Sequence, residues 1–379
     1  MKVAIVYDRV NKWGGAERVL LALHEMFPKA PLYTSVYDPK NASWTKVFPE
    51  IKTSFLQKFS FAKSNHEFLA PFMPFAFESF DFSDFDLVIS VTSEAAKGIK
   101  TKTGTYHLCY CLTPTRYLWS GYNEYFRDPV FRAITKPIVS ILRKWDKKAA
   151  ARPDKIIAIS TEVQKRIKKY YSRDSEIIYP PVDKLPSSEG RQKTNHKNQT
   201  NSKYYLLVGR LVGYKKVDLA IQAFNKLNYP LVIVGTGRDE KKLKKMSNKN
   251  IYFAGKVSEK ELVNYYQNAK ALIMPQEEDF GIVSIEAQSY GVPVIAYKKG
   301  GASDTVISGK TGLLFDSQTV KSLMQAVEKF DKMHFSERII KTNVQRFSKQ
   351  VFRRRLQETL VRANISGWGG DKTLAKIKK

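Results

Sequence analysis

The chain contains few cysteines, few acidic residues compared with basic ones, and no long hydrophobic run. Its two cysteines, Cys109 and Cys111, are separated by one residue in an apolar stretch. Such positions on one face of a strand cannot readily form a disulfide, and two thiols alone make a poor metal site, so we expect a buried, reduced pair, as is typical of the cytoplasm. No stretch provides the roughly 20 apolar residues that span a bilayer. The amino terminus enters a strand directly and lacks the apolar region of a secretory signal.

Acidic residues number 36 against 64 Lys and Arg, which gives a net charge of +28 and a pI near 9.8. Such an excess favours a negative partner, which could be lipid head groups, nucleic acid or a phosphorylated substrate. Basic residues are dense in residues 131–173, where we expect amphipathic helices at 130–150 and 162–171. Charge runs are usually solvated faces, but the first helix also has an apolar side that suits an anionic membrane surface. The pattern matches no recognised nucleic-acid module, so nucleic acid is not the expected partner.

The glycine fingerprint G-x-G-x-x-G of dinucleotide-binding enzymes is also absent, which disfavours an oxidoreductase. The first strand, expected at 3–7, is instead followed by Gly14 and Gly15 and then a helix. Strand, glycine loop and helix form the first unit of a doubly wound sheet. The two glycines would let the backbone approach a phosphate or sugar, although a tight turn without a ligand also explains them.

Length and pattern together predict an α/β protein with two doubly wound, Rossmann-like domains. The chain has 379 residues with 43% hydrophobic content, which exceeds one typical core. In the second half, strands are expected at 204–208, 231–234, 251–253, 271–274, 294–296 and 313–315, with helices between them. We assign an N-terminal domain at 1–183, a linker at 184–203, a C-terminal domain at 204–350, and a final helix with a basic tail at 351–379.

In the first half, the expected strand at 105–112 leads into a polar and aromatic loop at 113–119. Ligands of open α/β sheets bind beside the carboxyl ends of the strands, so this loop is a candidate binding segment. A lone histidine in a strand is usually a satisfied core residue, but this neighbouring loop makes a functional role for His107 more plausible.

In the second half, an acidic loop at 275–280 precedes a helix expected from 282 to 290. The start of a helix presents free N–H groups and a partial positive charge, which favours phosphate. Glu278 stands just before this helix and Glu286 one turn inside it. From spacing alone, a solvated loop acid and a first-turn acid favoured by the helix dipole explain the pair about equally well.

Two cations follow the strand at 204–208, namely Arg210 and Lys215. Because they leave the carboxyl end of that strand, we expect them near Glu278, where two cations and a helix start can hold a diphosphate. Two ordinary surface cations of a basic protein are the alternative. Gly235 follows the next strand and allows a further close backbone approach.

Segments along nearly the whole chain resemble retaining glycosyltransferases of family 4, which have the GT-B fold of two Rossmann-like domains facing across a cleft. The similar segments are GGAERV (14–19), EAAKGI (94–99), HLCYCLTPTRYLW (107–119), IIYPPVD (177–183), GRLVGYKKVD (209–218) and EEDFGIVSIEAQSYGVPVIAY (277–297), with GG at 300–301 and TG at 311–312. The combination is specific, although no single segment is. The chain most resembles the branch of bacterial surface-polysaccharide mannosyltransferases.

The resemblance implies a nucleotide diphosphate sugar as donor, GDP-mannose for this branch, held mainly by the C-terminal domain. Arg210 and Lys215 would hold the diphosphate, Glu286 the ribose, and Glu278 the hydroxyls of the transferred sugar. The other implied contacts are donor contacts at Gly14, Gly15, Gly235, Ile282 and Val283, a catalytic contact at His107, and acceptor contacts at Arg116, Tyr117 and Trp119. Lys216 departs from the family pattern, where a small residue is common, and leaves open which lysine reaches phosphate.

The implied reaction retains the anomeric configuration through attack on the same face of the sugar, and it needs neither metal nor cofactor. The D-x-D form at Asp84 and Asp86 resembles a manganese motif of a different glycosyltransferase fold, but hard cations need more ligands than this. The acceptor would be a glycan or a lipid-linked sugar. We expect a cytoplasmic protein that attaches peripherally to the inner face of the cell membrane.

Three rival functions remain open from the sequence. A sugar-nucleotide epimerase on the same fold would use the same donor site without an acceptor. A glycosidase would use Glu278 and Glu286 as its two carboxylates, but it would not need the cation pair. A non-enzymatic nucleic-acid binder would account only for the net charge.

Overall fold

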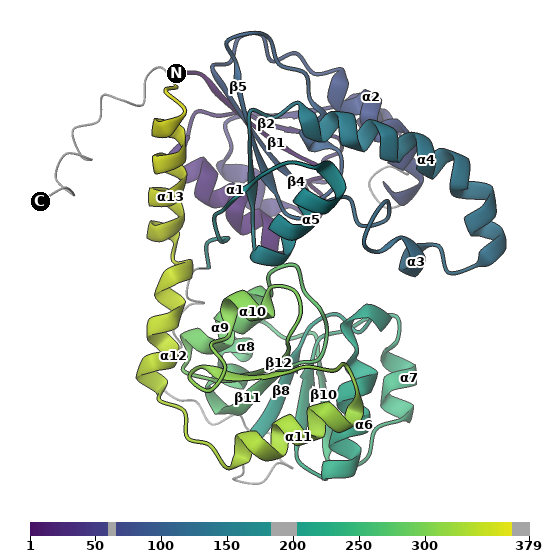
Figure 1. Cartoon of the computed structure of the whole chain (residues 1–379), viewed down its shortest axis with the longest axis vertical. Coiled ribbons are helices and arrows are strands. Elements are labelled where there is room, and N and C mark those ends of the chain that lie inside the picture. Colours follow the sequence, from purple (N-terminus) through teal and green to yellow (C-terminus); the bar gives the residue numbers. More distant parts are fainter. Residues whose placement is uncertain (60–65, 183–202, 366–379) are drawn as a thin grey trace, which may run out of the picture. The chain divides into compact units, whose positions relative to one another are not determined.

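The computed structural model describes residues 1–59, 66–182 and 203–365, which form two compact units (Figure 1). Unit 1 comprises Met1–Pro181 and Lys349–Lys379, and unit 2 comprises Val182–Ser348. The final helix is therefore part of unit 1, whereas the sequence suggested a separate segment at 351–379. Residues 184–202 of the expected linker, and the basic tail from 366 onward, lie outside the described residues.

Unit 1 is built on a seven-stranded parallel sheet with the order β3-β2-β1-β4-β5-β6-β7. Its strands are β1 Val3–Tyr7, β2 Leu32–Thr34, β3 Ile51–Thr53, β4 Leu87–Thr92, β5 Tyr106–Cys111, β6 Lys155–Ala158 and β7 Glu176–Ile177. The central strands β1 and β4 are buried along their whole length, as is usual when helices cover both faces of a parallel sheet.

The α-helices that the structure describes in this unit are α1 Gly15–Met26, α2 Met73–Glu78, α3 Tyr122–Tyr125, α4 Pro129–Ala151, α5 Thr161–Tyr171 and α13 Lys349–Arg362. The long α4 begins where the sequence directs it, because the Asp128 carboxylate accepts the N–H of Phe131 at 2.7 Å and Pro129 occupies the first position. Helix α13 joins unit 1 through Phe352, whose buried ring lies 5.8 Å from that of Tyr110.

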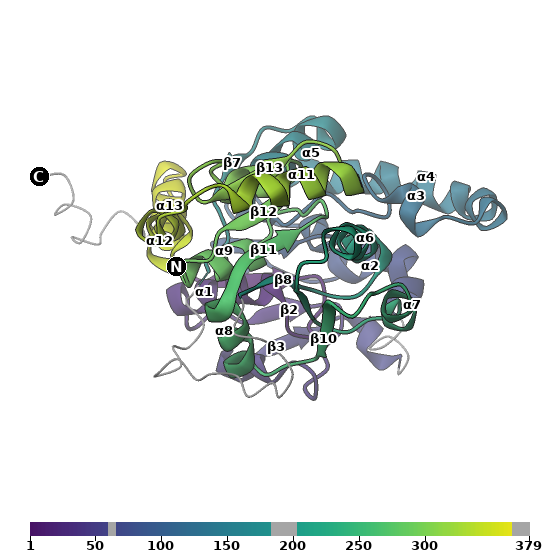
Figure 2. The same ribbon diagram turned by 90° about the horizontal axis from the view of Figure 1, so that it is seen from below.

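Unit 2 has a six-stranded parallel sheet with the order β10-β9-β8-β11-β12-β13. Its strands are β8 Tyr204–Val208, β9 Leu231–Val234, β10 Ile251–Gly255, β11 Ala269–Met274, β12 Val294–Tyr297 and β13 Gly312–Phe315. Its helices are α6 Val217–Leu227, α7 Glu240–Lys245, α8 Glu259–Asn268, α9 Ile282–Ser289, α10 Ala302–Thr305, α11 Val320–Asp331 and α12 Glu337–Val344. Helices α6 and α11 lie over one face of the sheet, and α8 and α9 lie over the other (Figure 2). Apolar residues of each pair pack against the strands beneath them. Two doubly wound domains are thus confirmed.

Three local features of unit 1 do not follow from its sequence pattern. Strands β2 and β3 were not predicted, since three residues are too few for a hydrophobic period to stand out. The segment at 93–99 has a helical composition but forms only a 3₁₀ turn at Ala96–Gly98. The apolar segment at 177–182 contributes only the end of the two-residue strand β7, because two prolines at 180–181 cannot donate to a ladder.

Candidate functional site

The strand order of unit 2 places its topological switch point between β8 and β11. From β8 the chain continues to β9 on one side, and it returns to β11 on the other side. In open parallel sheets, ligands bind at such a point, outside the carboxyl ends of the two strands. Arg210 and Lys215 follow β8, and Glu278 follows β11, so all three belong to segments that leave this edge.

Lys215 and Glu278 are in direct contact. The Lys215 ammonium donates to Oε1 of Glu278, and the buried Gln276 amide donates to the same oxygen at 2.9 Å. The two charged side chains are 17% and 18% exposed. The pair is therefore fixed in position but still open to solvent on one side. The prediction that Lys215 and Glu278 lie close together at the carboxyl edge of the sheet is confirmed by this contact.

Arg210 is exposed and held by Tyr214 rather than by a carboxylate. Its Nη2 donates to the Tyr214 hydroxyl at 2.6 Å, and its guanidinium lies 5.9 Å from the centre of that ring. The Lys215 ammonium lies 5.3 Å from the same ring centre. Tyr214 thus contacts both cations, and a ring face attracts cations placed in this way.

Helix α9 starts beside this cluster without a side-chain cap. Gly281 precedes it with a φ of +87°, a left-handed conformation that favours glycine, and Ile282 and Val283 form the first turn. The first N–H groups of a helix have no partner within the helix, so a start without a capping side chain is suited to an external anion.

Two glycines fix the acidic loop that precedes α9. The Gly301 N–H donates to the Glu278 carbonyl at 2.8 Å. A Cβ at Gly300 would lie 2.1 Å from that same carbonyl oxygen, and a Cβ at Gly301 would lie 2.3 Å from the backbone of Phe280. Only glycine permits this approach, so the GG pair of the sequence supports the loop that carries Glu278.

Glu286 belongs to α9, and its carboxylate contacts Tyr266 of α8. Its side chain is buried, and its Oε2 accepts the Tyr266 hydroxyl at 2.9 Å. It stands in the second turn, so it is not the first-turn acid favoured by the helix dipole that spacing alone allowed.

The glycines after β8 and β9 pack against each other's backbone. A Cβ at Gly235 would lie 2.0 Å from the Gly209 carbonyl oxygen, and one at Gly237 would lie 2.3 Å from that of Leu211. Backbone packing therefore explains Gly235 without a ligand. Gly209 is different, because a Cβ added there meets nothing within 4 Å. It leaves open space directly before Arg210.

In unit 1, His107 does not lie at the ligand edge. It is the second residue of β5 and is fully buried, and its Nε2 is 2.8 Å from the Ser90 hydroxyl. Burial, with the charges of Arg152 and Arg173, lowers the pKa of His107 to about 3. The ring is therefore neutral and enclosed near the amino end of its strand. The structure therefore does not place His107 at the ligand edge where a catalytic role was predicted, and its burial fits the alternative of a core histidine.

The candidate acceptor residues sit in a loop fixed by the buried Asp146 of α4. Its carboxylate accepts the Trp119 indole N–H at 2.7 Å and the Thr115 hydroxyl at 2.9 Å, and it pairs with the buried Lys97 at 2.6 Å. Trp119 thereby supports the loop. The Tyr117 hydroxyl donates a hydrogen bond to the Glu94 carboxylate, and Arg116 is half-buried.

Gly14 and Gly15 stand at the start of α1, where Gly14 is the N-cap residue. The nearest side chain is that of Glu17, whose Oε2 would lie 3.2 Å from a Cβ at Gly14. Glu17 is buried and accepts the Tyr7 hydroxyl at 3.1 Å, and burial raises its pKa.

The segments that follow β1 and β4 carry charged residues that were not predicted as site residues from the sequence. Asp8 and Arg9 follow β1, and Glu94 follows β4. The available signal was Asp-Arg immediately after a fully apolar strand, which parallels Gly-Arg after β8. Neither pattern stands out unless the two halves are compared residue by residue.

Comparison with known proteins agrees with this architecture. Residues 188–346 match the family described as glycosyl transferases group 1. This match lies within unit 2 and covers less than half of the chain. An uncharacterized glycosyltransferase of Methanocaldococcus jannaschii is 26% identical over 55% of this chain and 58% of its own length. A GDP-mannose-dependent phosphatidylinositol monomannoside mannosyltransferase of Mycolicibacterium smegmatis is 33% identical over 32% of this chain and 36% of its own.

The fold itself is that of GT-B glycosyltransferases. The structure of Anabaena HepE in complex with UDP superposes with a TM-score of 0.69, at 18% identity, and covers 95% of this chain and all of that chain. The chain spans little more than half the length of the first curated relatives it matches.

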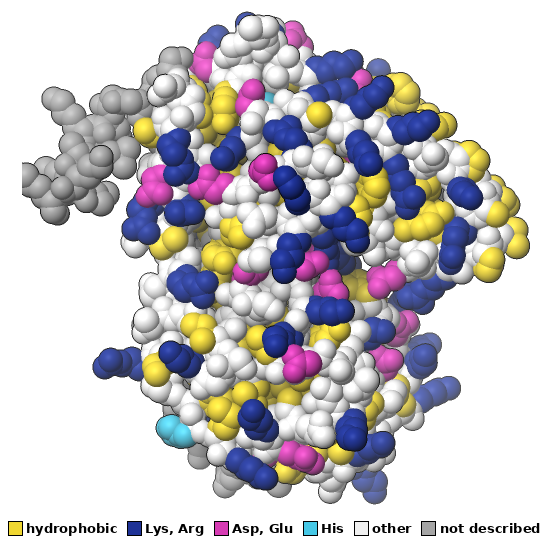
Figure 3. Space-filling view, viewed as in Figure 1, with side chains coloured by type: hydrophobic (Ala, Val, Ile, Leu, Met, Phe, Trp, Pro, Cys, Tyr) yellow, Lys and Arg dark blue, Asp and Glu magenta, His cyan; other side chains and the backbone are white. Residues whose placement is uncertain are grey.

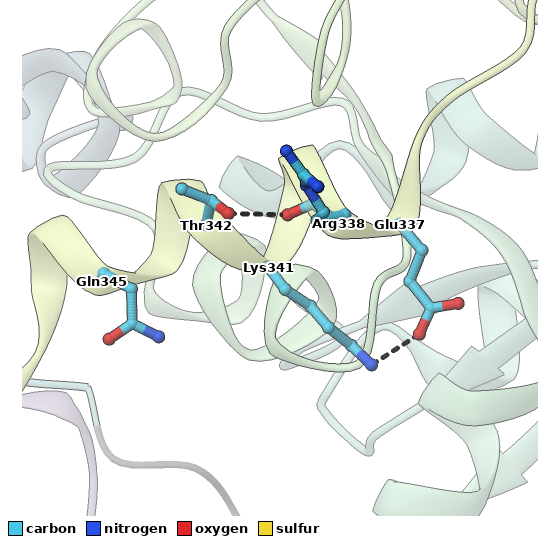
Figure 4. A pocket seen from close by; sticks show the side chains of 5 residues that line it. All are labelled: Glu337, Arg338, Lys341, Thr342 and Gln345. Atoms are coloured by element: carbon cyan, nitrogen blue, oxygen red, sulfur yellow. Dashed lines mark hydrogen bonds and ion pairs between the residues drawn. The ribbon is translucent and has the colours of Figure 1, made fainter.

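Within residues 1–59, 66–182 and 203–365, the other surface features offer no competing site. A hollow beside α12 is lined by Glu337, Arg338, Lys341, Thr342 and Gln345 (Figure 4). All five come from one helix or its end, and Lys341 is already paired with Glu337 at 2.5 Å. Among the residues the structure describes, there is no cluster of three possible metal ligands from His, Cys, Asp and Glu. No helix in the described ranges is long and apolar enough to cross a membrane.

Proposed function

We propose that the protein is a retaining glycosyltransferase that moves a hexose from a nucleotide diphosphate sugar to a glycan or lipid-linked acceptor. The hexose that we propose is mannose. The observation that carries this proposal is the cluster between β8 and β11. There, Arg210, Lys215 and Glu278 lie beside an α9 start that has no side-chain cap, and Gly209 leaves open space next to them. Two cations with a helix start suit a diphosphate.

In this proposal the donor diphosphate lies against Arg210 and Lys215. As the bond from the sugar to the diphosphate breaks, negative charge grows on the leaving phosphate, and groups held in place beforehand stabilise that charge. Lys215 is held by Glu278 and Arg210 by Tyr214, so little reorganisation is needed. The cations take the role that a metal ion has in other folds, which is why we propose a metal-independent reaction.

Glu278 and Glu286 have separate roles. Glu278 holds Lys215 through its Oε1, and its carboxylate also accepts hydrogen bonds from hydroxyls of the transferred sugar. Glu286, which Tyr266 orients, accepts from the ribose hydroxyls. The acceptor hydroxyl attacks the sugar from the face that the diphosphate leaves, and the leaving phosphate takes its proton. An inverted product anomer would refute the retaining mechanism.

For the donor we propose GDP-mannose. The mycobacterial relative is named as GDP-mannose-dependent, whereas HepE was solved with UDP. Thermal unfolding with GDP-mannose, UDP-glucose and ADP-glucose distinguishes them, because a ligand that binds only the folded state raises the midpoint by mass action. We expect the largest rise with GDP-mannose. No rise with any nucleotide sugar would contradict the proposal, and turnover of the donor without an acceptor would favour the epimerase.

We further propose peripheral attachment to an anionic membrane at the cytoplasmic face. Helix α4 exposes large apolar side chains along one side, namely Val130, Phe131, Ile134, Ile138 and Ile141, while lysines at 136, 144, 147 and 148 are also exposed (Figure 3). Apolar side chains flanked by lysines suit the boundary of an anionic bilayer. Cosedimentation with vesicles of phosphatidylglycerol, but not with vesicles of phosphatidylcholine alone, is the expected result. Equal binding to both would remove the electrostatic part of the proposal.

A further inference from the structure

Unit 1 has a second charged cluster at its own topological switch point. In its sheet, β1 continues to β2 on one side and has β4 as its neighbour on the other. Open sheets bind ligands outside the carboxyl ends of the two strands at such a point, here β1 and β4. Arg9 follows β1 and Glu94 follows β4, so both residues belong to segments that leave these ends.

We propose that Arg9, Glu94 and Tyr117 form a binding site for hydroxyl groups of the acceptor sugar. That the ligand is the acceptor rests on the proposed function, whereas the site itself rests on the geometry of unit 1. Arg9 Nη1 lies 2.8 Å from Glu94 Oε2, and the Tyr117 hydroxyl donates to Glu94 Oε1 at 2.8 Å. The three side chains come from segments that follow three adjacent strands, β1, β4 and β5.

The backbone beneath this cluster is fixed from two sides. The buried Asp8 carboxylate accepts the N–H groups of Ser93, Ala95 and Ala96 at 2.7 to 2.9 Å. The ammonium of the buried Lys97 donates to the Glu94 carbonyl oxygen and pairs with Asp146 of α4. Glu94 is thereby held at the sheet edge before any ligand arrives, which is what a binding residue requires.

Stability alone does not account for such a pair. Taking two charges out of water costs as much as their attraction returns in many proteins, so a buried ion pair is weak support for a purely stabilising role. Burial raises the pKa of Glu94, and the Arg9 guanidinium opposes that rise. Arg9 keeps 20% of its side chain exposed, against 5% for Glu94, so the cluster is open on the Arg9 side.

The charges select the ligand class. Asp8 and Glu94 outnumber Arg9, and the charge of the neighbouring Lys97 is balanced by Asp146, so the cluster has a net negative charge that repels a phosphate. Asp8 also occupies the N–H groups on which an anion would sit. A neutral hydroxyl can donate to the Glu94 carboxylate and accept from the Arg9 guanidinium. The site therefore suits a sugar, whether that sugar is free or linked to a lipid.

Saturation-transfer NMR on the full-length protein tests the site directly, with methyl α-mannopyranoside, methyl α-glucopyranoside and methyl α-galactopyranoside as probes. We expect the wild type to bind at least one of them, and Glu94→Gln to weaken that binding by about tenfold or more, as for the loss of a hydrogen bond to a charged group. Tyr117→Phe, which keeps the ring, should weaken it by a smaller factor.

The matched control is Glu78→Gln. Glu78 accepts from Arg152 at 2.6 Å and from the Trp145 indole at 2.7 Å, so it has the same kinds of partner, but it lies at the end of α2 and not after a strand. This variant should lower thermal stability and leave glycoside binding unchanged. If Glu94→Gln and Tyr117→Phe also change only stability, or if the wild type binds none of the three glycosides, the proposal is overturned.

Nucleotide binding separates this outcome from failure of the proposed function. Glu94→Gln should keep the wild-type thermal shift with GDP-mannose, because the donor site is built from unit 2. A wild type that binds a glycoside but no nucleotide sugar would refute the proposed function and leave the sugar site standing. The reverse result would refute the sugar site alone.

Discussion

The two sheets end their first strands with the same short pattern, and one residue in it differs. In unit 1, β1 ends at Tyr7 and continues with Asp8 and Arg9. In unit 2, β8 ends at Val208 and continues with Gly209 and Arg210. Asp8 is buried and bonded to three backbone N–H groups, whereas Gly209 leaves the corresponding space open.

The difference explains how one scaffold can serve two kinds of ligand. In unit 1, the Asp8 carboxylate already accepts the N–H groups that follow β4, so no external anion is needed there. Unit 2 starts α9 after Gly281 without a capping side chain, and an external phosphate can take that place. In unit 1, Asp8, Arg9 and Glu94 are two acids and one cation, while in unit 2 the contacting groups Arg210, Lys215 and Glu278 are two cations and one acid. On this basis we place the diphosphate in unit 2 and the neutral sugar in unit 1.

The largest expected effect comes from making unit 2 resemble unit 1. Gly209→Asp should fit sterically, since a Cβ there meets no atom within 4 Å and the φ is not in the left-handed region. Its carboxylate would neutralise Arg210 and repel the diphosphate. At about 4 Å and an effective dielectric constant of about 20, this repulsion is worth about 4 kcal/mol at most, so nucleotide affinity should fall by about 100-fold to 1,000-fold. Calorimetric titration with GDP and UDP measures the change.

Gly209→Asn is the matched control for Gly209→Asp, because it adds nearly the same volume without the charge. It should lose far less affinity. Equal losses in the two variants would show that space, and not charge, is what Gly209 provides, and the electrostatic contrast between the two units would fail.

Removal of the Arg210 charge should lower turnover almost as strongly. Arg210→Ala at saturating donor is expected to reduce kcat by about 100-fold, as for one donor that stabilises a developing negative charge. Arg238→Ala is the control, since Arg238 is exposed in the same unit and its nearest acidic partner is the adjacent Asp239, at 3.7 Å. An Arg210→Ala enzyme with wild-type kcat would contradict the proposed role.

The pH dependence of stability tests the status of His107 in unit 1. Its pKa in the folded state is about 3, below the ordinary value of about 6.5, so the unfolded chain binds the proton more readily. The free energy of unfolding should therefore fall as pH drops from about 6.5 towards 3, by up to about 1.4 kcal/mol per pH unit. His107→Gln should lose this component and keep wild-type activity near neutral pH.

Urea unfolding of the wild type and of His107→Gln, at neutral pH and at about pH 4, measures the difference. An unchanged pH slope would contradict the assigned pKa. A large loss of activity at neutral pH would restore the catalytic role that burial argues against.

The contrast also shows how far the sequence alone could reach. Strands β8 and β9 were predicted to the residue, because each is a short apolar run bounded by turn residues. The Lys215–Glu278 contact was predictable because both residues leave the same edge of a parallel sheet. His107 misled because a residue early in a strand lies away from the ligand edge, and only strand boundaries reveal that. The Arg9–Glu94 pair depends on two loops 85 residues apart that meet only once the strand order is known.

The smallest expected effect concerns what holds the two arginines. Arg9 faces the carboxylate of Glu94, which cancels its charge, whereas Arg210 donates to the neutral hydroxyl of Tyr214 and keeps its charge for a ligand. Tyr214→Phe removes that hydrogen bond but leaves the ring beneath both cations, so the KM for the donor should rise only about threefold to tenfold. Tyr214→Ala also removes the ring contact with Lys215 and should raise KM further. If the two variants raise KM equally, the hydroxyl alone positions Arg210. If neither variant changes KM, Arg210 does not need its contact with Tyr214. This part of the contrast between the units would then have no functional meaning.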